Sequence, residues 1–444
     1  MRQKIVATCA VAGIAALALA GCSGSSGSPT ATAAPVSTAV SGQGKTLTVW
    51  DYESNDSAMG ASWNAAIAEF EKETGAKVNF QSKAFEQIQS TASQILNSDS
   101  APDVMEYNKG NGTAGTLATQ GLLTNLDSAY QTYGWANKIA PSLLTTSKYS
   151  DKGIMGSGNY YGVTNYGEYV EFYYNKAMFQ KYGLTVPTTL AQLEQDMQVF
   201  VDHGITPLAE AAQEYPLGQL WYQLALSKAD RTWVNAYQTY TSKVDWTGPE
   251  LSYATQTLKD WESKGYISKD AAGMKAQDAG NAFEAGTSPI FYSGSWWYGT
   301  FEQQINKFDW GTFLFPQSTM APGSSGNIWV VPTKAKEKDL AYKFIDITLQ
   351  KAQQDLMGNK GGIPVAADPS AITDPKNKEL IQNFTTLTGR DGIGFYPDWP
   401  TSTFYTQLNA GLQELLNGTK TPDQVNQELG SEYQAGVDQI VQQP

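Results

Sequence analysis

The chain has 444 residues and a formal net charge of −13 at pH 7, from 30 basic and 43 acidic side chains. A chain this acidic is not expected to bind nucleic acid or to hold a membrane through a basic patch. It contains one histidine and two cysteines, which is too few for a zinc site or for Cys-His chemistry. We therefore expect no metal and no cofactor.

The first 22 residues have the pattern of a lipoprotein export signal. A basic start precedes the apolar run from Ile5 to Ala20, and this run is too short to span a bilayer comfortably before Cys22 is reached. We expect residues 1–21 to be a signal peptide that is removed, so that Cys22 carries a diacylglycerol on its thiol and, in all, several acyl chains such as palmitate. Several acyl chains on one cysteine would hold the protein on the extracellular face of the cell membrane.

Residues 22–44 are expected to be a flexible linker. Beyond Cys22 this stretch is dominated by Ser, Gly, Thr, Ala and Pro, so it cannot bury enough apolar surface to fold. Cys9 leaves with the signal peptide and Cys22 is acylated, so the folded part has no disulfide. About 400 residues remain behind the linker. Because this is more than one core usually supports, two lobes are predicted.

The folded part begins with alternating strands and helices. Strand patterns cover 45–50, 76–81 and 103–107, and helical apolar spacing lies between them, with Gly75 as the stop of the first helix. The order is therefore βαβαβ. This alternation predicts a mainly parallel sheet that helices cover on both faces, with ligands at the carboxyl ends of the strands.

A second group of elements begins near Gly162. We expect a Tyr-rich strand up to Tyr174, and further strands at 288–292 and 328–331. The helices expected between and after them are 176–182, one that Thr188 or Thr189 caps and that ends at Gly204, 217–228, 249–264 and 338–349.

Aromatic side chains are frequent for so acidic a chain, with 12 Trp and 24 Tyr. Pyranose rings present CH faces that lie flat on aromatic rings, and their hydroxyls need carboxylate, amide and hydroxyl partners. Core packing explains any single aromatic residue, so only their joint position at strand ends and in loops favours a sugar site. The residues in such positions are Tyr52, Tyr107, Tyr215, Trp296, Trp297, Trp399 and Tyr405.

An enzymatic interpretation has less support. A glycoside hydrolase needs two carboxylates that face each other across the scissile bond, and Glu168 with Glu214 is one conceivable pair in a chain rich in acids. The only histidine, His203, lies in the last turn of a predicted helix, where a capping role is ordinary. The glycines have no Walker spacing, so a phosphate-binding loop is not indicated. We predict no catalytic residue.

Eight segments, taken together, resemble one known family. The segments are TVWDYE at Thr48, FEKETGAKVNF at Phe70, APDVMEYN at Ala101, GLLTNLD at Gly121, YYNKAMFQKYGLTVPTTLAQL at Tyr173, AFEAGTSPIFYSGSWW at Ala282, GNIWVVPTKAKEKDLAYKFI at Gly326 and GGIPV at Gly361. In this order they make the chain resemble extracellular solute-binding protein family 1, the maltose-binding-protein-like sugar-binding proteins of ABC importers, and especially its lipoprotein members from Gram-positive bacteria. The resemblance covers nearly the whole chain.

The resemblance implies an α/β chain with the two-lobed periplasmic-binding-protein fold of type II. Each lobe would be a mainly parallel sheet flanked by helices, and the ligand would lie in a cleft at the hinge. Lobe 1 is expected to contain 45–160 and 288–331, and lobe 2 to contain 161–287 and 332–444. Closure of the lobes would be driven by contacts that both make with the ligand at once.

The resemblance also implies which residues bind the ligand. Tyr52 and Glu53 end the first strand and Tyr107 and Asn108 follow the third, where family members place polar and aromatic groups. Glu168 stands where a hinge-side acid hydrogen-bonds sugar hydroxyls. The other residues implied to contact the ligand are Glu214, Tyr215, Trp296 in a Gly-x-Trp turn, Trp297, Trp399 and Tyr405.

The function implied is that of a non-enzymatic receptor. It would capture an extracellular sugar, in particular an oligosaccharide, and deliver it to the permease subunits of an ABC importer while a lipid anchor holds it at the membrane. Two alternatives stay open at this point. One is a surface glycoside hydrolase, and the other is the same fold with another solute, such as a polyamine or a metal ion.

Overall fold

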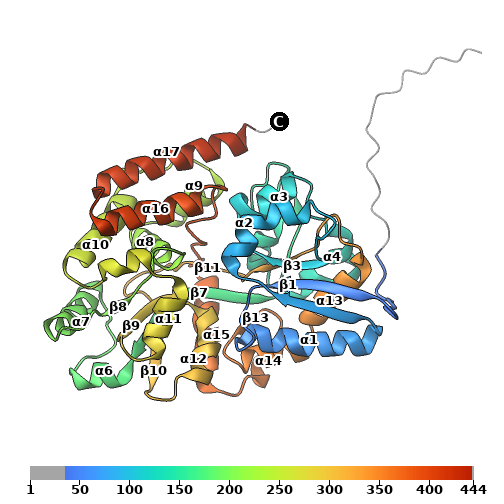
Figure 1. Cartoon of the computed structure of the whole chain (residues 1–444), viewed down its shortest axis with the longest axis horizontal. Helices are drawn as coiled ribbons and strands as arrows, with labels where there is room; N and C mark the ends of the chain where they lie inside the picture. Colours follow the sequence, from blue (N-terminus) through green and yellow to red (C-terminus); the bar gives the residue numbers. More distant parts are fainter. Residues whose placement is uncertain (1–35, 443–444) are drawn as a thin grey trace, which may run out of the picture. The chain divides into compact units, whose positions relative to one another are not determined.

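The computed structural model describes residues 36–442 (Figure 1). The predicted signal peptide, Cys22 and the linker up to Pro35 lie outside these residues. Over 36–442, none of the helices is both long enough and apolar enough to cross a bilayer.

The end of the expected linker belongs to the folded body. The Gly42 N–H donates to the Thr74 carbonyl over 2.8 Å, and Val36 and Val40 pack against the core. Residues 36–44 are therefore not a free tether, because their two valines find apolar partners that the sequence does not reveal.

The first sheet has five strands. Their order is β2 (Lys77–Ser82), β1 (Thr46–Asp51), β3 (Val104–Tyr107), β12 (Ile328–Val330) and β6 (Val163–Thr164). β1 is parallel to both β2 and β3, which confirms the predicted parallel arrangement of the first three strands. β12 runs antiparallel to β3 and to β6.

Helices cover this sheet. α1 (Ala58–Thr74) starts at Ser57, whose side chain accepts from the Gly60 N–H, and ends at Gly75 in the left-handed conformation, as predicted. α13 (Lys338–Thr348) and α14 (Lys351–Gly358) pack against α1 (Figure 1). Trp63 of α1 contacts Trp329 of β12 at 5.2 Å between ring centroids, so this core is closed by aromatic packing.

The second sheet is built around the long strand β7 (Tyr166–Asn175). The strands that pair with β7 are β10 (Trp310–Phe313), β9 (Ile290–Gly294), β11 (Gly323–Ser324) and β13 (Ile363–Pro364). β8 (Leu208–Ala209) pairs with β9. β8 and β9 are parallel, but β7 is antiparallel to β9, β10, β11 and β13. This differs from the expected mainly parallel sheet, because β7 runs opposite to its neighbours, with Val170 facing Gly294 and Tyr174 facing Ile290 of β9.

Strand pairing and helix packing also depart from the expected lobe boundaries. β9 and β10 lie within 288–331, a range expected in lobe 1, but both pair with β7 in the second sheet. Conversely, α13 and α14 lie within 332–444, a range expected in lobe 2, but pack against α1 beside the first sheet. Apolar periodicity predicts an element but not its partner, so these assignments are corrected by the structure.

The remaining elements are mostly helices, and they lie beside both sheets (Figure 1). They are α2 (Phe85–Leu96), α3 (Thr116–Thr119), α4 (Asp127–Tyr133), α5 (Trp135–Lys138), α6 (Lys176–Lys181), α7 (Leu190–Asp202), α8 (Pro216–Leu226), α9 (Arg231–Thr239), α10 (Pro249–Ser263), α11 (Ala276–Glu284), α12 (Tyr298–Gln304), α15 (Pro375–Gly389), α16 (Phe404–Asn417), α17 (Pro422–Val441) and the short pair β4 (Lys148–Tyr149) and β5 (Asn159–Tyr160). Thr189 caps α7, as one of the two predicted candidates.

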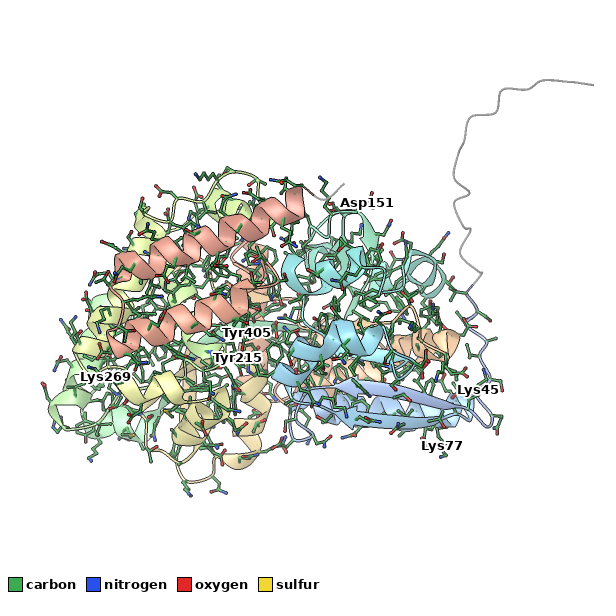
Figure 2. All side chains as sticks on the ribbon, turned by 45° about the horizontal axis from the view of Figure 1, so that its top comes forward. Lys45, Lys77, Asp151, Tyr215, Lys269 and Tyr405 are labelled. Carbon is green, nitrogen blue, oxygen red and sulfur yellow. The ribbon has the colours of Figure 1, made fainter. Side chains whose placement is uncertain are left out.

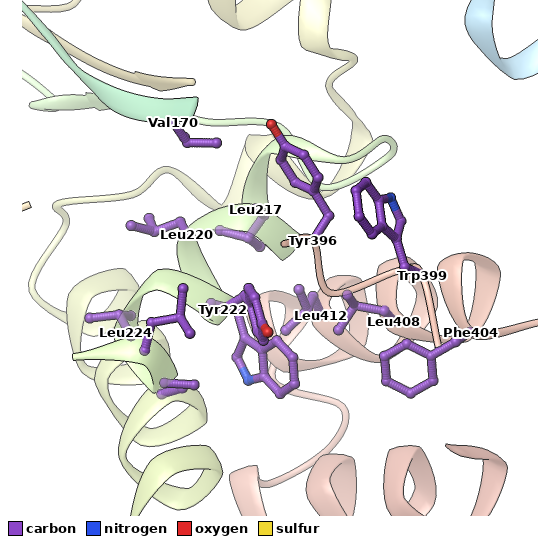
Figure 3. Packing of buried hydrophobic residues seen from close by; sticks show 14 of the residues in the cluster. Val170, Leu217, Leu220, Tyr222, Leu224, Tyr396, Trp399, Phe404, Leu408 and Leu412 are labelled. Atoms are coloured by element: carbon purple, nitrogen blue, oxygen red, sulfur yellow. The ribbon is translucent and has the colours of Figure 1, made fainter. Parts of the chain in front are cut away.

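α8 and α16 form an apolar surface against which the loop between α15 and α16 packs. Leu217 and Leu220 of α8 and Leu408 and Leu412 of α16 are buried in one cluster (Figure 3). Trp399 of the loop is buried in the same cluster, so its position is fixed by packing from below. The packed side chains of α8 and α16 therefore give the loop a rigid support.

Candidate functional site

A cavity of about 150 Å³ lies between the residues that follow β1 and β3 of the first sheet and residues of β7, of the turn after β9 and of the start of α8. One buried water needs roughly 10–15 Å³ on the same measure, so the cavity has room for a ligand much larger than water. Its walls consist of Tyr52, Glu53, Phe85, Asn108, Lys109, Glu168, Tyr215, Gln219, Trp296, Asn327, Tyr396, Asp398, Trp399 and Tyr405.

One wall comes from the carboxyl ends of two neighbouring parallel strands. Tyr52 and Glu53 follow β1, and Asn108 and Lys109 follow β3. Because adjacent parallel strands end at the same sheet edge, their next residues converge there. This wall is therefore rich in charged and amide groups.

Lys109 is the centre of a buried polar network. Its Nζ donates to Glu168 Oε1 and to Asn327 Oδ1, each over 2.7 Å, and both partners of the ion pair are at most 5% exposed. Ser324 Oγ also donates to Glu168 Oε1 over 2.8 Å. A buried ion pair needs such additional hydrogen bonds to offset its loss of hydration, so Glu168 is held in one position.

The opposite wall is mainly aromatic. Trp296 lies in a short 3-10 turn directly after β9, and Tyr215 lies directly before α8. Their rings meet edge to face at 5.7 Å, and Trp296 Nε1 donates to the Tyr215 hydroxyl over 3.3 Å. Because Trp296 follows the end of β9 and Tyr215 precedes the start of α8, the faces of both rings are available to the cavity.

The loop before α16 adds an acid and two further rings. Tyr396 and Trp399 contact each other at 5.3 Å and lie close together in Figure 3. Trp399 Nε1 donates to Asn108 Oδ1 over 3.2 Å, and Asn108 Nδ2 donates to Asp398 over 3.3 Å. This loop is therefore joined to the wall that follows β3.

Gly110 is required for this close approach. Its φ is 106°, and a Cβ at this position would lie 2.4 Å from Trp399 Cβ. No other residue type combines this backbone conformation with the absence of a side chain. The loop can therefore seat Trp399 against the chain that follows Lys109.

Phe85 links the two walls across the cavity. At the start of α2, it contacts Tyr52 at 5.2 Å, Tyr215 at 6.2 Å and Tyr405 at 6.4 Å, and Figure 2 labels the last two. The Tyr405 hydroxyl also donates to Glu86. The walls are thus in contact, as in a closed cleft.

The charged groups that line the cavity are three carboxyls and one ammonium: Glu53, Glu168, Asp398 and Lys109. Burial, with a contribution from the charge of Glu168, raises the pKa of Glu53 to about 7, and burial raises the pKa of Asp398 to about 6. Burial also lowers the pKa of Lys109, although Glu168 opposes this shift. Groups with such shifts in a cavity are typical of functional sites.

Three polar atoms in the walls have no hydrogen-bond partner among the described residues. They are Tyr52 Oη, Gln219 Oε1 and Tyr396 Oη. An unpaired buried polar group costs free energy that a bound partner can recover. These atoms are therefore positions where a ligand with hydroxyl groups would gain hydrogen bonds.

Residues 54–355 match the profile of the family described as bacterial extracellular solute-binding protein. This match spans more than half of the chain. The chain belongs to this family.

The solute-binding protein is similar to characterised relatives over most of its length. The diacetylchitobiose binding protein DasA of Streptomyces coelicolor is 25% identical over 355 residues, 77% of this chain and 75% of that protein. A solved chitin oligosaccharide binding protein aligns over 88% of this chain and 98% of its own with a TM-score of 0.75 and 19% identity. The GacH receptor of Streptomyces glaucescens aligns over 90% and 99% with a TM-score of 0.72 and 20% identity. The predicted two-lobed fold of type II is thereby confirmed.

Most of the ligand-contact residues predicted from the sequence converge on this cavity. Those in its walls are Tyr52, Glu53, Asn108, Glu168, Tyr215, Trp296, Trp399 and Tyr405. Glu168 and Trp296 therefore line the same cavity. Their contact with a ligand stays a prediction.

Three predicted residues lie elsewhere in the solute-binding protein. Tyr107 is the last residue of β3 and is buried in the core, at 4% exposure. Glu214 accepts from the Ala276 N–H at the start of α11 over 2.9 Å. Trp297 stacks on Phe301 at 5.4 Å, inside the core beside α12. Each of these three residues is adjacent in the sequence to a predicted residue that lines the cavity, but its own side chain packs elsewhere.

Six wall residues were not predicted: Phe85, Lys109, Gln219, Asn327, Tyr396 and Asp398. Lys109 directly follows the predicted Asn108, so the rule of strand ends could have found it. In the segment Tyr396-Pro397-Asp398-Trp399-Pro400, two aromatic residues and one acid stand next to two prolines. This combination is the signal that could have found Tyr396 and Asp398. The other three have no comparable signal.

The other chemistry considered from the sequence finds little support in the site. Of the conceivable pair Glu168 and Glu214, only Glu168 lines the cavity. His203 caps α7, and its Nδ1 lies 2.7 Å from the Val199 carbonyl oxygen. Within the described part of the chain, no group of three or more His, Cys, Asp or Glu could hold a metal ion.

Proposed function

We propose that this solute-binding protein captures an extracellular oligosaccharide and delivers it to the permease subunits of an ABC importer. The observation that carries this proposal is the composition of one cavity. Aromatic rings line one wall, and carboxylate, amide and ammonium groups line the other. Three buried polar atoms between them have no hydrogen-bond partner within residues 36–442.

This combination matches the chemistry of a sugar. The CH faces of a pyranose pack on rings such as Trp296 and Tyr215, while its hydroxyls donate to carboxylates such as Glu168 and accept from the Lys109 ammonium. A purely apolar ligand would leave these polar groups unpaired. A small anion would meet three carboxyls and one ammonium, so repulsion would oppose its binding.

Relatives support the same ligand class. DasA is named for diacetylchitobiose, another relative is named as a multiple sugar-binding protein of Streptococcus mutans, and the GacH receptor was solved in complex with acarbose. The identity to these proteins is low, so the particular sugar of this protein is set by its own wall residues. The loop with Tyr396, Asp398 and Trp399 is one of the parts that would determine it.

Binding would be coupled to closure of the two lobes. A ligand stabilises the closed state only through contacts that the open state lacks. The hydrogen bonds from Tyr405 to Glu86 and from Trp399 to Asn108 join the walls. A sugar held between Trp296 and Glu53 would add to these contacts and shift the population toward the closed state, which would then dock on the permease.

The receptor would act outside the cell and break no bond. We propose that residues 1–21 are removed as a signal peptide and that acyl chains on Cys22 hold the protein at the membrane. This anchor keeps the receptor near its importer. It is tested by metabolic labelling with a palmitate analogue, which should label the wild type and leave Cys22→Ser unlabelled.

Calorimetry tests the ligand class directly. Purified protein from residue 23 onward is titrated with xylo-, malto-, chito-, fructo- and manno-oligosaccharides, and saturable binding to at least one series is expected. Spermidine serves as the comparison solute, because clustered acids also suit a polyamine. Heat with spermidine but with no sugar would reject the oligosaccharide. Release of reducing ends from any of these sugars would point to a hydrolase instead.

A further inference from the structure

A phenol hydroxyl joins two buried carboxyl groups beneath the polar wall of the cavity. The Tyr166 hydroxyl lies 3.1 Å from Glu53 Oε1 and 3.2 Å from Glu106 Oε1. Asn327 Nδ2 donates to the same hydroxyl over 2.7 Å. Glu53 lines the cavity and is 9% exposed, whereas Glu106 lies behind it on β3 and is 1% exposed.

The direction of the Asn327 hydrogen bond is fixed by its neighbour. Lys109 donates to Asn327 Oδ1 over 2.7 Å, and an ammonium group cannot accept. The amide oxygen of Asn327 therefore faces Lys109, and its NH₂ group faces Tyr166. One of the two lone pairs of the Tyr166 oxygen is thus occupied.

Counting protons around Tyr166 then determines the state of the two carboxyls. The phenol has one hydrogen, so it donates to one of the two glutamates. The other glutamate makes a hydrogen bond only if it carries a proton and donates to the remaining lone pair. If both were ionised, one carboxylate oxygen would face a phenol lone pair without a proton between them. The pair Glu53 and Glu106 therefore holds at least one proton.

The surroundings favour Glu106 as the carrier of this proton. From β1 and the two residues after it, Asp51, Tyr52 and Glu53 face Glu106, and β7 contributes Tyr166. Lys109 is the cation that acts on it, at the end of its own strand. Burial and the charges of Glu53 and Asp51 raise the pKa of Glu106 well above its ordinary value, and the pKa of Glu53 is about 7.

We propose that Glu106 is a protonated positioning residue that acts through the Tyr166 hydroxyl to keep Glu53 ionised and oriented toward the ligand. This inference rests on the proposed function of the same cavity. With Glu106 as the donor to Tyr166 and Tyr166 as the donor to Glu53, the second oxygen of Glu53 is left as an acceptor for ligand hydroxyls. Glu53 and Glu168 would then both be acceptors, and each would be held by a different buried partner.

Infrared spectroscopy of the ligand-free protein tests the proton directly. At neutral pH, the wild type should show the carbonyl stretch of a protonated carboxyl group, and Glu106→Gln should lose one such band. Asp51→Asn is the matched control, because Asp51 is equally buried, has a pKa raised to about 8 and lies on the neighbouring strand. This control should remove a separate band and leave that of Glu106 in place. No lost band in Glu106→Gln would overturn the proposal.

The pH dependence of stability gives a second readout. A carboxyl group whose pKa is raised by folding stabilises the folded state at low pH, and this contribution is lost as the pH rises through the folded-state value. Between about pH 6 and pH 9, the melting temperature of the wild type should therefore fall. The fall should be smaller in Glu106→Gln, which has no carboxyl proton to lose at this position. Equal slopes for the two proteins would contradict the assignment.

Sugar affinity tests the positioning role, with maltotriose, xylotriose and diacetylchitobiose as probes. Glu106→Gln keeps an N–H donor for Tyr166 and should bind within about threefold of the wild type at pH 6, with less loss of affinity toward pH 9. Glu106→Met has a similar size but no donor, and should bind at least about tenfold more weakly. Equal affinities of the two variants would reject the positioning role. Absence of binding by the wild type would instead count against the proposed function, while the infrared result would still decide the state of Glu106.

Discussion

The two walls of the cavity differ in how their side chains are held. On the wall that follows β1 and β3, the charged groups are buried and each has a fixed partner, as in the pair of Lys109 and Glu168. On the opposite wall, Trp296 and Tyr215 are only partly buried and contact each other by their edges. The first wall therefore contributes to the stability of the fold as well as to the site, whereas the rings of the second wall can change with less effect on folding.

The largest effect expected from this difference is on stability, for the variant Lys109→Met. It removes the one ammonium that lines the cavity among residues 36–442 and leaves Glu168 buried without this countercharge. Removal of one partner of a buried ion pair costs about 3–5 kcal/mol. The free energy of unfolding, measured by urea denaturation at neutral pH, should fall by this amount.

The double variant Lys109→Met with Glu168→Gln is the control for this prediction. It removes both charges, so much of the lost stability should return even though the site is altered. If Lys109→Met alone is as stable as the wild type, the pair is not a structural centre of the first wall.

The sequence predicts the first wall better than the second, and the reason is physical. A parallel βαβαβ unit places the residues after its strands at one edge, and the resemblance to the family marks Tyr52, Glu53 and Asn108 at this edge as ligand contacts. The loop with Tyr396 and Asp398 has no periodicity, and its position depends on packing against α16, which follows it, and against α8, which is far away in the sequence. The choice between Trp296 and Trp297 depends on the direction of one short turn.

The same reason explains the errors in the fold. Apolar spacing predicts β9 and α13 within a few residues of their observed ends. It carries no information about the strand or helix that each will meet, and this partner decides the lobe. The direction of β7 relative to β9 is likewise set by tertiary pairing and not by the local sequence.

A smaller effect, now on affinity, is expected for Trp296→Ala in the second wall. Loss of the ring face removes a stacking surface for the sugar, which should weaken binding by at least about 1 kcal/mol, or roughly fivefold. Calorimetry with the best sugar of the screen measures this change. The melting temperature should change little, because Trp296 is only partly buried.

Trp297→Phe provides the matched control for Trp296→Ala. Trp297 is the next residue, but its ring stacks on Phe301 inside the core. This variant should therefore keep the affinity for sugar and lower the stability. The opposite pattern for the two tryptophans would mean that the ring of Trp296 serves the core and that the second wall is not a binding surface.

The smallest effect is expected where the two walls meet, in Tyr405→Phe. The substitution keeps the ring that contacts Phe85 and removes only the hydroxyl that donates to Glu86 across the cavity. One hydrogen bond contributes about 0.5–1.5 kcal/mol, so the dissociation constant should rise about two- to tenfold. Since this bond joins the lobes and need not touch the sugar, Glu86→Met, which has no acceptor for the hydroxyl, should have a similar effect, and the double variant should be no weaker than the weaker single one. Additive losses would mean instead that each side chain contacts the sugar by itself, and closure would then depend on the ligand alone.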